Sequence, residues 1–190
     1  MNKRLWPMLC IIAGALVSAT ASAATTGETT YRLSAAGPVS AAADTTGNPV
    51  ELIAKGFVDT VTRRPSTAET TVRLSVDIAN LYVAFDCEQA IPVTANQRID
   101  GVGHGQDDTV TISLDTSAAG LRTYAFSATP RGTRYAVSSE STRYQPQWRV
   151  VSEARQAGYR VRMTIPLSVL RITPGPQIWR VNLTRRIALT

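Results

Sequence analysis

The chain has 190 residues, of which 44% are hydrophobic and 18% are charged, and its net charge is +6. This composition is ordinary for one globular domain with its own core and excludes wholesale disorder. Only the first segment is apolar enough to enter a bilayer, which excludes a protein with several membrane spans. Lys3 and Lys55 are the only lysines. The positive charge therefore consists almost entirely of guanidinium groups, which suit carboxylates, phosphates and sulfates.

The N-terminus has the parts of a secretory signal peptide in their usual order. Lys3 and Arg4 precede the apolar run Met8–Val17, and small residues then lead to Ala23. The apolar run is too short to span a bilayer stably. We therefore predict a signal peptide over residues 1–23, cleaved after Ala23. The mature protein is expected to be secreted or to lie in the periplasm or cell envelope, and to contact the membrane only during export.

The segment after the predicted cleavage site differs in composition from the rest. Residues 24–48 are rich in Ala, Ser, Thr and Gly, so we expect a flexible segment with one short edge strand at Thr30–Leu33. Cys87 is then the only remaining cysteine, which excludes an intramolecular disulfide. It is in phase with Val83 and Phe85, so we expect a buried thiol rather than a reactive one.

From residue 49 to residue 190 short segments alternate between apolar and polar residues. The expected strands cover residues 50–59, 72–76, 81–87, 110–114, 124–126, 133–137, a segment opened by Trp148, 159–165 and 178–186. One helical turn is expected at Pro166–Leu170. Short strands at steady spacing, with almost no helical periodicity, indicate an all-β fold. We predict an antiparallel jelly-roll/immunoglobulin-like β-sandwich.

Five blocks between Ala68 and Ile187 occur in the order of a known family. They are Asn80–Cys87, Asp107–Thr116, Tyr124–Gly132, Gly158–Pro166 and Trp179–Leu183. In these blocks the chain resembles the family 9 carbohydrate-binding module-like domain of secreted bacterial proteins. The resemblance implies a jelly-roll-like sandwich that binds carbohydrate without catalysis, in a protein of carbohydrate catabolism. The chain departs from the family at residues 37–56, which lack the usual tryptophan, and at Arg162, which replaces an acidic residue.

Sugar recognition needs flat aromatic faces together with planar polar groups. The best local combination lies between Tyr144 and Trp148, where Gln145, Gln147 and Arg149 are interleaved. We therefore predict a carbohydrate site made of Trp148, Tyr144, Gln147, Arg149 and Arg162, with Trp148 and Tyr144 as a stacking platform. The competing interpretation is that Trp148 begins a strand and packs inward. Trp179 is in phase with apolar residues and is expected in the core.

Four arginines are expected to form a basic strip on one sheet face. Arg160 and Arg162 share one polar phase, and Arg180 and Arg186 share another, on two strands that we expect to be neighbours. Such a strip would suit a uronate or a sulfated glycan, so an acidic poly- or oligosaccharide is the expected partner. A solvated face is the competing interpretation.

The titratable residues give weaker signals. Asp107 and Asp108 are adjacent and would make at most a poor structural calcium site, so no metal or other cofactor is expected. Hydrolysis of glycosides needs a pair of carboxylates, and the spacing of the acidic residues selects no such pair, so we do not expect an enzyme.

His104 is the only histidine and lies in a glycine-rich loop. It is expected to be a flexible surface residue, and one histidine excludes a zinc site with several histidines.

Two alternatives remain besides carbohydrate binding. Sandwiches related to the family can hold a haem through a methionine, for which Met163 is the candidate, but the chain has no C-x-x-C-H motif. The missing early tryptophan instead favours a structural or protein-interaction sandwich whose sugar site has been lost. Nucleic acid is not an expected partner, because no motif combines aromatic and basic residues.

Overall fold

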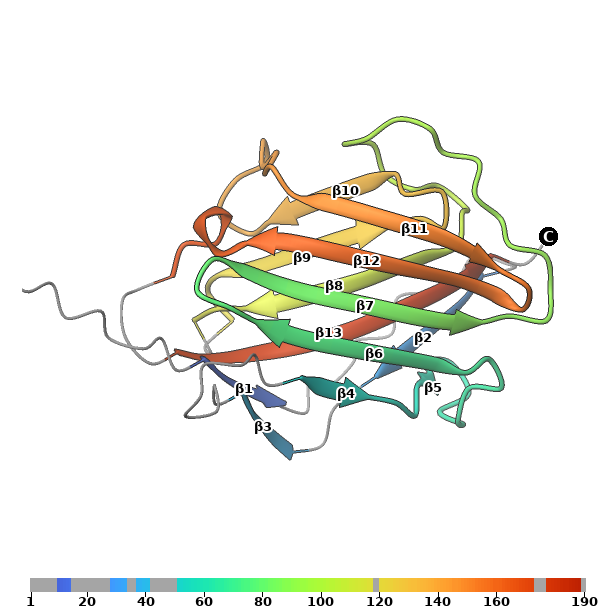
Figure 1. Ribbon diagram of the computed structural model, residues 1–190, viewed down its shortest axis with the longest axis horizontal. Coiled ribbons are helices and arrows are strands. Elements are labelled where there is room, and N and C mark those ends of the chain that lie inside the picture. Colours follow the sequence, from blue (N-terminus) through green and yellow to red (C-terminus); the bar gives the residue numbers. More distant parts are fainter. Residues whose placement is uncertain are drawn as a thin grey trace, which may run out of the picture.

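The computed structural model describes residues 10–14, 28–33, 37–41, 51–117, 120–172 and 177–188. These residues form two β-sheets, and the five-stranded sheet lies in front of the larger one in Figure 1. The all-β sandwich that the alternating pattern predicts is therefore confirmed. Within the described ranges, no helix has the length and apolar character needed to cross a bilayer.

The five-stranded sheet is antiparallel throughout, and residues 77–80 form the turn of one of its hairpins. Its order is β11 (Arg149–Arg155), β12 (Gly158–Pro166), β7 (Asn80–Glu88), β6 (Thr70–Val76) and β4 (Leu52–Ala54). The turn between β6 and β7 is closed by Asp77, whose carboxylate accepts the N–H groups of Ala79 and Asn80 at 2.7 Å. Gly158 begins β12 with φ +129°, and a Cβ there would lie 2.0 Å from the carbonyl oxygen of Cys87. Glycine is therefore required where β12 approaches β7.

The larger sheet is built around the long last strand. Its order is β10 (Arg134–Ser138), β9 (Thr123–Ala128), β8 (Thr109–Asp115), β13 (Gln177–Ala188), β1 (Cys10–Gly14) and β3 (Gly37–Ala41), while β2 (Glu28–Leu33) pairs with both β13 and β5 (Val58–Asp59). The pairing of β1 with β13 is parallel, whereas the other pairs are antiparallel.

Two strands lie within residues 24–48, where a flexible segment with one short edge strand is expected. β2 confirms a strand at Thr30–Leu33 but is paired on both sides, so it is not an edge strand, and β3 is a further strand between residues 24 and 48. β1 lies in the predicted signal peptide. Residues 15–27, with the predicted cleavage site at Ala23, lie outside the described part of the chain.

The core between the sheets is made by the inward phase of the strands. Along β7 the residues Leu81, Val83, Phe85 and Cys87 are all buried, and Trp179 of β13 is fully buried. The predicted core positions of Cys87 and Trp179 are thus confirmed, and burial raises the pKa of the Cys87 thiol to about 11. A 3₁₀ helix, η1 (Leu167–Val169), confirms the helical turn expected at Pro166–Leu170.

Arg185 is a charged residue on the inward phase of β13, and it is fully buried. Its guanidinium donates to the Glu69 carbonyl at 3.1 Å and to Thr70 Oγ1 at 2.8 Å. It also donates to the Glu88 carbonyl and to Gln89 Oε1, both at 2.8 Å. These acceptors belong to β6, β7 and their flanking residues, so Arg185 fastens the larger sheet to the five-stranded one.

Candidate functional site

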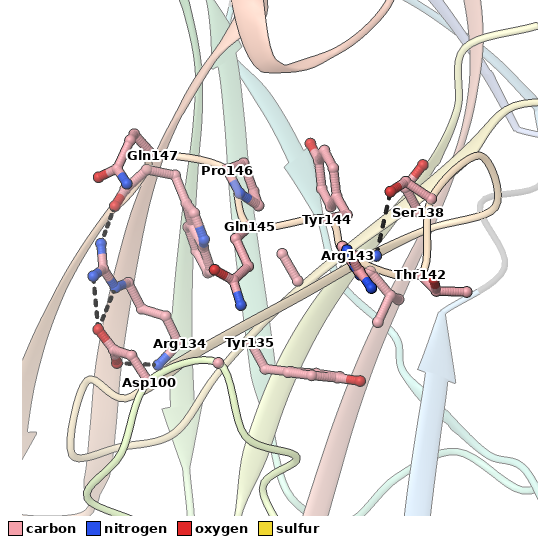
Figure 2. A pocket seen from close by; sticks show the side chains of 15 residues that line it. Asp100, Arg134, Tyr135, Ser138, Thr142, Arg143, Tyr144, Gln145, Pro146 and Gln147 are labelled. Carbon is pink, nitrogen blue, oxygen red and sulfur yellow. Dashed lines mark hydrogen bonds and ion pairs between the residues drawn. The ribbon is translucent and has the colours of Figure 1, made fainter.

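A pocket of about 620 Å³ lies at one edge of the sandwich, between β10 and the loop that leads to β11 (Figure 2). We call it the β10-edge pocket; it is lined by residues 100–101, 134–138 and 141–148. Its volume falls in the range of small-molecule sites, roughly 300–1,000 Å³. The pocket forms here because β10 and β11 are edge strands of different sheets, and the chain must cross from one sheet to the other.

One side of the β10-edge pocket is fixed by an ion pair between Arg134 and Asp100. Arg134 Nη2 lies 2.6 Å from Asp100 Oδ2, and Arg134 Nε lies 2.9 Å from the same oxygen. Arg134 also donates to the carbonyl of Trp148. Burial acts to raise the pKa of Asp100, but the hydrogen bonds and charge of Arg134 outweigh it and keep the pKa below its ordinary value. Asp100 is therefore an anion at neutral pH, and it holds Arg134 in place.

The loop that forms the opposite side is anchored by Tyr144. The Tyr144 hydroxyl donates to the Val169 carbonyl in η1 at 3.0 Å, and its ring packs against Tyr124 and Phe126 at centroid distances of 5.5 and 6.2 Å. Burial raises the pKa of Tyr144, so the hydroxyl stays neutral and remains a donor.

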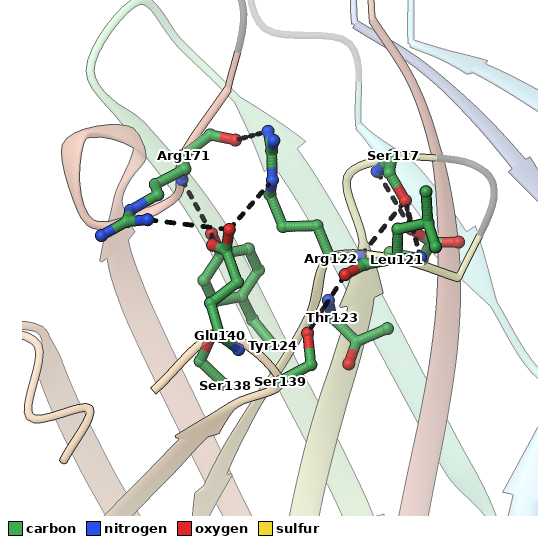
Figure 3. A network of polar contacts seen from close by, with 10 residues as sticks. Ser117, Leu121, Arg122, Thr123, Tyr124, Ser138, Ser139, Glu140 and Arg171 are labelled. Atoms are coloured by element: carbon green, nitrogen blue, oxygen red, sulfur yellow. Dashed lines mark hydrogen bonds and ion pairs between the residues drawn. The ribbon is translucent and has the colours of Figure 1, made fainter. Parts of the chain in front are cut away.

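A second anchor of the same loop is the carboxylate of Glu140 (Figure 3). Tyr124 donates to Glu140 Oε2 at 2.9 Å, and the guanidinium groups of Arg122 and Arg171 lie 3.4 and 3.7 Å from Oε1. Arg122 also donates to the carbonyl of Arg171 at 2.7 Å. This network joins the start of the loop to β9 and to Arg171, two residues after η1, so the loop is held at both places.

The stacking platform expected from Trp148 and Tyr144 is not supported by this geometry. Trp148 is 4% exposed, and its ring lies edge-on to Phe126 at a centroid distance of 5.2 Å. Tyr144 is half-buried against the core. Both residues line the pocket, but the indole packs inward, as the competing interpretation held. Gln147 and its neighbour Gln145 are exposed, and both belong to the polar part of the pocket lining.

Arg149 and Arg162 do not lie in the β10-edge pocket. They line a separate groove on the outer face of the five-stranded sheet. The structure thus divides the five residues of the predicted site between two places: Tyr144, Gln147 and Trp148 line the pocket, and the two arginines line the groove.

The predicted basic strip is wrong. Arg160 and Arg162 belong to β12 in the five-stranded sheet, whereas Arg180 and Arg186 belong to β13 in the larger sheet. Alternation fixes which side chains of a strand share a phase, but it does not fix which strands are neighbours. The two pairs of arginines therefore cannot share one sheet face.

The two adjacent aspartates act as backbone acceptors. Asp108 is fully buried and accepts from the N–H groups of Thr94 at 3.0 Å and Ala188 at 2.6 Å. Asp107 accepts from the N–H groups of Asn96 at 2.8 Å and Gln97 at 2.6 Å. Both carboxylates thus hold the loop before β8. Among the described residues, no three acidic, histidine or cysteine side chains are grouped so that they could hold a metal ion.

His104 is not the surface residue that its glycine-rich loop predicts. It is 8% exposed, and its ring lies edge-on to that of Tyr135 at a centroid distance of 6.0 Å. Burial lowers the pKa of His104, which favours the neutral imidazole. Glycine-rich composition predicts a flexible backbone, but it carries no information on what the loop packs against.

Three residues at the border of the pocket were not singled out from the sequence: Asp100, Arg134 and Tyr135. Asp100 and Arg134 are 34 positions apart, and no local pattern links them. Long-range ion pairs of this kind follow from the packing of the loop, so the sequence offers no signal for them.

In the comparisons with known proteins, no family model matches this chain and no curated protein matches its sequence.

Proposed function

We propose that this protein is a non-catalytic carbohydrate-binding domain of an exported protein, and that the β10-edge pocket holds the sugar. The observation that carries the proposal is that the loop chosen from the sequence for its aromatic and amide residues lines a preformed pocket of about 620 Å³. The resemblance to the family 9 carbohydrate-binding module-like domain supports the same function, and the predicted signal peptide supports export.

The chemistry of the pocket suits hydroxyl-rich ligands. Gln145 and Gln147 are exposed and make no side-chain hydrogen bond within the described residues, so their amides are available to sugar hydroxyls. Arg134 is held by Asp100 and contributes a fixed guanidinium edge. Preorganised polar groups of this kind lower the entropy that binding costs.

A pair of amide substitutions tests the proposal. Binding of neutral and acidic glycans to the purified protein is measured on an array, and the tightest ligand is titrated by calorimetry. Gln145→Ala with Gln147→Ala should weaken that ligand at least about tenfold, since two hydrogen bonds of roughly 1 kcal/mol each are lost. Gln106→Ala with Gln156→Ala is the matched control, because both glutamines are exposed and lie outside the pocket. Failure of every glycan to bind would contradict the proposed function.

A second candidate function is a protein-interaction sandwich. It is favoured by the burial of Trp148, which leaves the pocket without an open indole face, and by the exposure of Ile53 and Val151 on the outer face of the five-stranded sheet, at 59% and 54%. The glycan array separates the two candidates, because an interaction domain without a sugar site would bind none of the glycans.

A further inference from the structure

The outer face of the five-stranded sheet contains a groove of about 230 Å³. Its residues come from four neighbouring strands, and Ala84 of β7 lies between Arg73 of β6 and Arg162 of β12 in the strand register. Directly opposed residues on adjacent strands have Cβ atoms roughly 5 Å apart. A methyl group between two long side chains therefore leaves a hollow, which we call the Ala84 groove.

More arginines than acidic residues line the Ala84 groove. Arg73, Arg149 and Arg162 line it, against one acidic residue, Glu51. Arg73 is paired with Asp86 at 2.6 Å, and Arg162 is paired with Glu153. Each of these two charges is therefore already partly neutralised by the protein.

Arg149 differs from the other two arginines. It is exposed, and within the described part of the chain its guanidinium has neither a hydrogen-bond partner nor an ion-pair partner. A free guanidinium at the rim of a hollow can offer two parallel N–H groups to a carboxylate or a sulfate. The groove thus has a built-in position for one anionic group.

Tyr82 supplies an aromatic ring in the lining of the same groove, two strands away from Arg149. It lies on β7 in the register row that continues through Thr164 to Arg149. Its hydroxyl donates to Asp77 Oδ2 at 2.8 Å and accepts from Asn80 Nδ2 at 3.2 Å, while 36% of the residue remains exposed. The ring is therefore held in place and still accessible to the C–H face of a pyranose.

The location of the groove favours a sugar over an acidic peptide. β7 and β12 are interior strands with partners on both sides, so their backbone groups are used within the sheet. A peptide lying over the face of β7 and β12 would find no main-chain partners for an added strand, and the free edge of β11 lies only at the border of the groove. A sugar acid needs only an aromatic face and a cation.

We propose that the Ala84 groove binds an acidic sugar residue of a polysaccharide, with Arg149 holding its carboxylate or sulfate and Tyr82 supporting its ring. This site is separate from the β10-edge pocket and does not depend on it. Arg73 and Arg162 border the bound residue, and the unpaired charge of Arg149 attracts the anionic group, so binding weakens as salt concentration rises.

Calorimetric titration of the purified protein tests the groove with three probes. They are a trigalacturonate, its fully methyl-esterified form, and a sulfated oligosaccharide such as a chondroitin sulfate hexamer. Trigalacturonate or the sulfated probe should bind, and the neutral ester should bind at least tenfold more weakly. Equal binding of the acid and its ester, or no binding of either anionic probe, would overturn the proposal.

Two variants locate the site. Arg149→Ala should weaken the anionic probe at least about tenfold, because a charge-assisted bidentate contact is lost, and Tyr82→Ala should weaken it severalfold. Arg64→Ala is the matched control, since Arg64 is exposed and lies outside the groove. The affinity of this variant for the anionic probe should stay within twofold of that of the unmodified protein at the same salt concentration. Equal losses of affinity for Arg149→Ala and Arg64→Ala would mean that only the net charge of the protein matters, and the proposed site would then be wrong.

Two further outcomes would place the ligand in the β10-edge pocket or identify it as a peptide. If Gln145→Ala with Gln147→Ala abolishes binding of the acidic sugar while Arg149→Ala leaves it intact, the ligand occupies the β10-edge pocket. The groove proposal then fails, and the proposed function stands. If a hexaglutamate peptide binds as tightly as the sugar and Tyr82→Ala has no effect on either, the groove recognises charge alone and the polysaccharide assignment fails.

Discussion

Arg185 and Arg149 show what the same side chain does in two regions of this protein. Arg185 lies between the sheets, is fully buried, and donates hydrogen bonds to four acceptors. Arg149 lies on the outer face of the five-stranded sheet, is exposed, and has no partner among the described residues. In the first region the guanidinium stabilises the fold, and in the second it remains available to a ligand.

The difference follows from solvation. A buried cation depends on protein acceptors, because water is absent. Arg185 directs Nη1 and Nη2 at four of them, while its Nε has no partner within the described residues. An exposed cation is already satisfied by water, and its removal changes the free energy of folding little. Residue type alone therefore does not separate structural arginines from binding arginines; burial and partners do.

The largest expected effect is that of Arg185→Met. The substitution keeps an unbranched side chain but removes the donor of four hydrogen bonds, two of them to the buried side chains of Thr70 and Gln89, so we expect the free energy of unfolding to fall by about 3–5 kcal/mol. Urea denaturation followed by circular dichroism measures this change. Arg149→Met is the control and should stay within about 0.5 kcal/mol. A loss below about 1 kcal/mol for Arg185→Met would contradict the claim that the buried arginine stabilises the fold far more than the exposed one.

Next in size is Asp108→Asn. The carboxylate accepts from Thr94 N, Ala188 N and Gln89 Nε2, and an amide would turn one acceptor into a donor that faces donors. We expect a loss of about 2–4 kcal/mol in unfolding experiments. Asp86→Asn on the outer face is the comparison, where Asp86 is paired with Arg73 and Arg160. Its loss should be smaller, about 1 kcal/mol, and the reverse order would contradict the role given to burial.

A smaller effect is expected at the loop of the β10-edge pocket. Tyr144→Phe removes the hydrogen bond to the Val169 carbonyl, which should cost about 1 kcal/mol of stability. Tyr135→Phe is the matched control, because the Tyr135 hydroxyl has no hydrogen bond within the described residues. Thermal unfolding of both variants measures the difference. Equal melting temperatures for the two variants would mean that Tyr144 does not anchor the loop.

The smallest effect is a pH dependence from His104, the only histidine in the chain. Burial lowers its pKa in the folded protein from an ordinary value of 6.5. Between these two values the unfolded chain binds a proton that the folded protein does not, so stability rises with pH in that window and is lost as pH falls through it. Urea denaturation between pH 5 and pH 8 should show this slope, and His104→Gln should flatten it. An NMR titration that finds the pKa of His104 at or above 6.5 would contradict the prediction.

Much of the fold was predictable from the sequence. The alternation at residues 72–76, 81–87, 110–114 and 159–165 predicted strands that the structure contains, and the phase of Cys87 and Trp179 predicted their burial. A period of two residues determines which side chains share a face, and apolar faces pack inward. These are local properties, which is why a single sequence reveals them.

The candidate site was predictable only in part. Residues 144–148, singled out for their aromatic and amide side chains, line a pocket in the structure; the carbohydrate site itself stays a prediction. The burial of Trp148, the ion pair between Arg134 and Asp100, and the division of the arginines between two sheets were not predictable. Each depends on which strands are neighbours and on which loop covers which edge.

By itself, the sequence determined an all-β sandwich, its core phase, and a chain whose positive charge is almost wholly arginine. The tertiary structure decided what those arginines do. It buried Arg185 between the sheets, fixed Arg134 against Asp100, and left Arg149 unpaired in the lining of the Ala84 groove. The physical reason is that side-chain phase is a property of one strand, whereas burial and pairing arise only when strands distant in sequence come together.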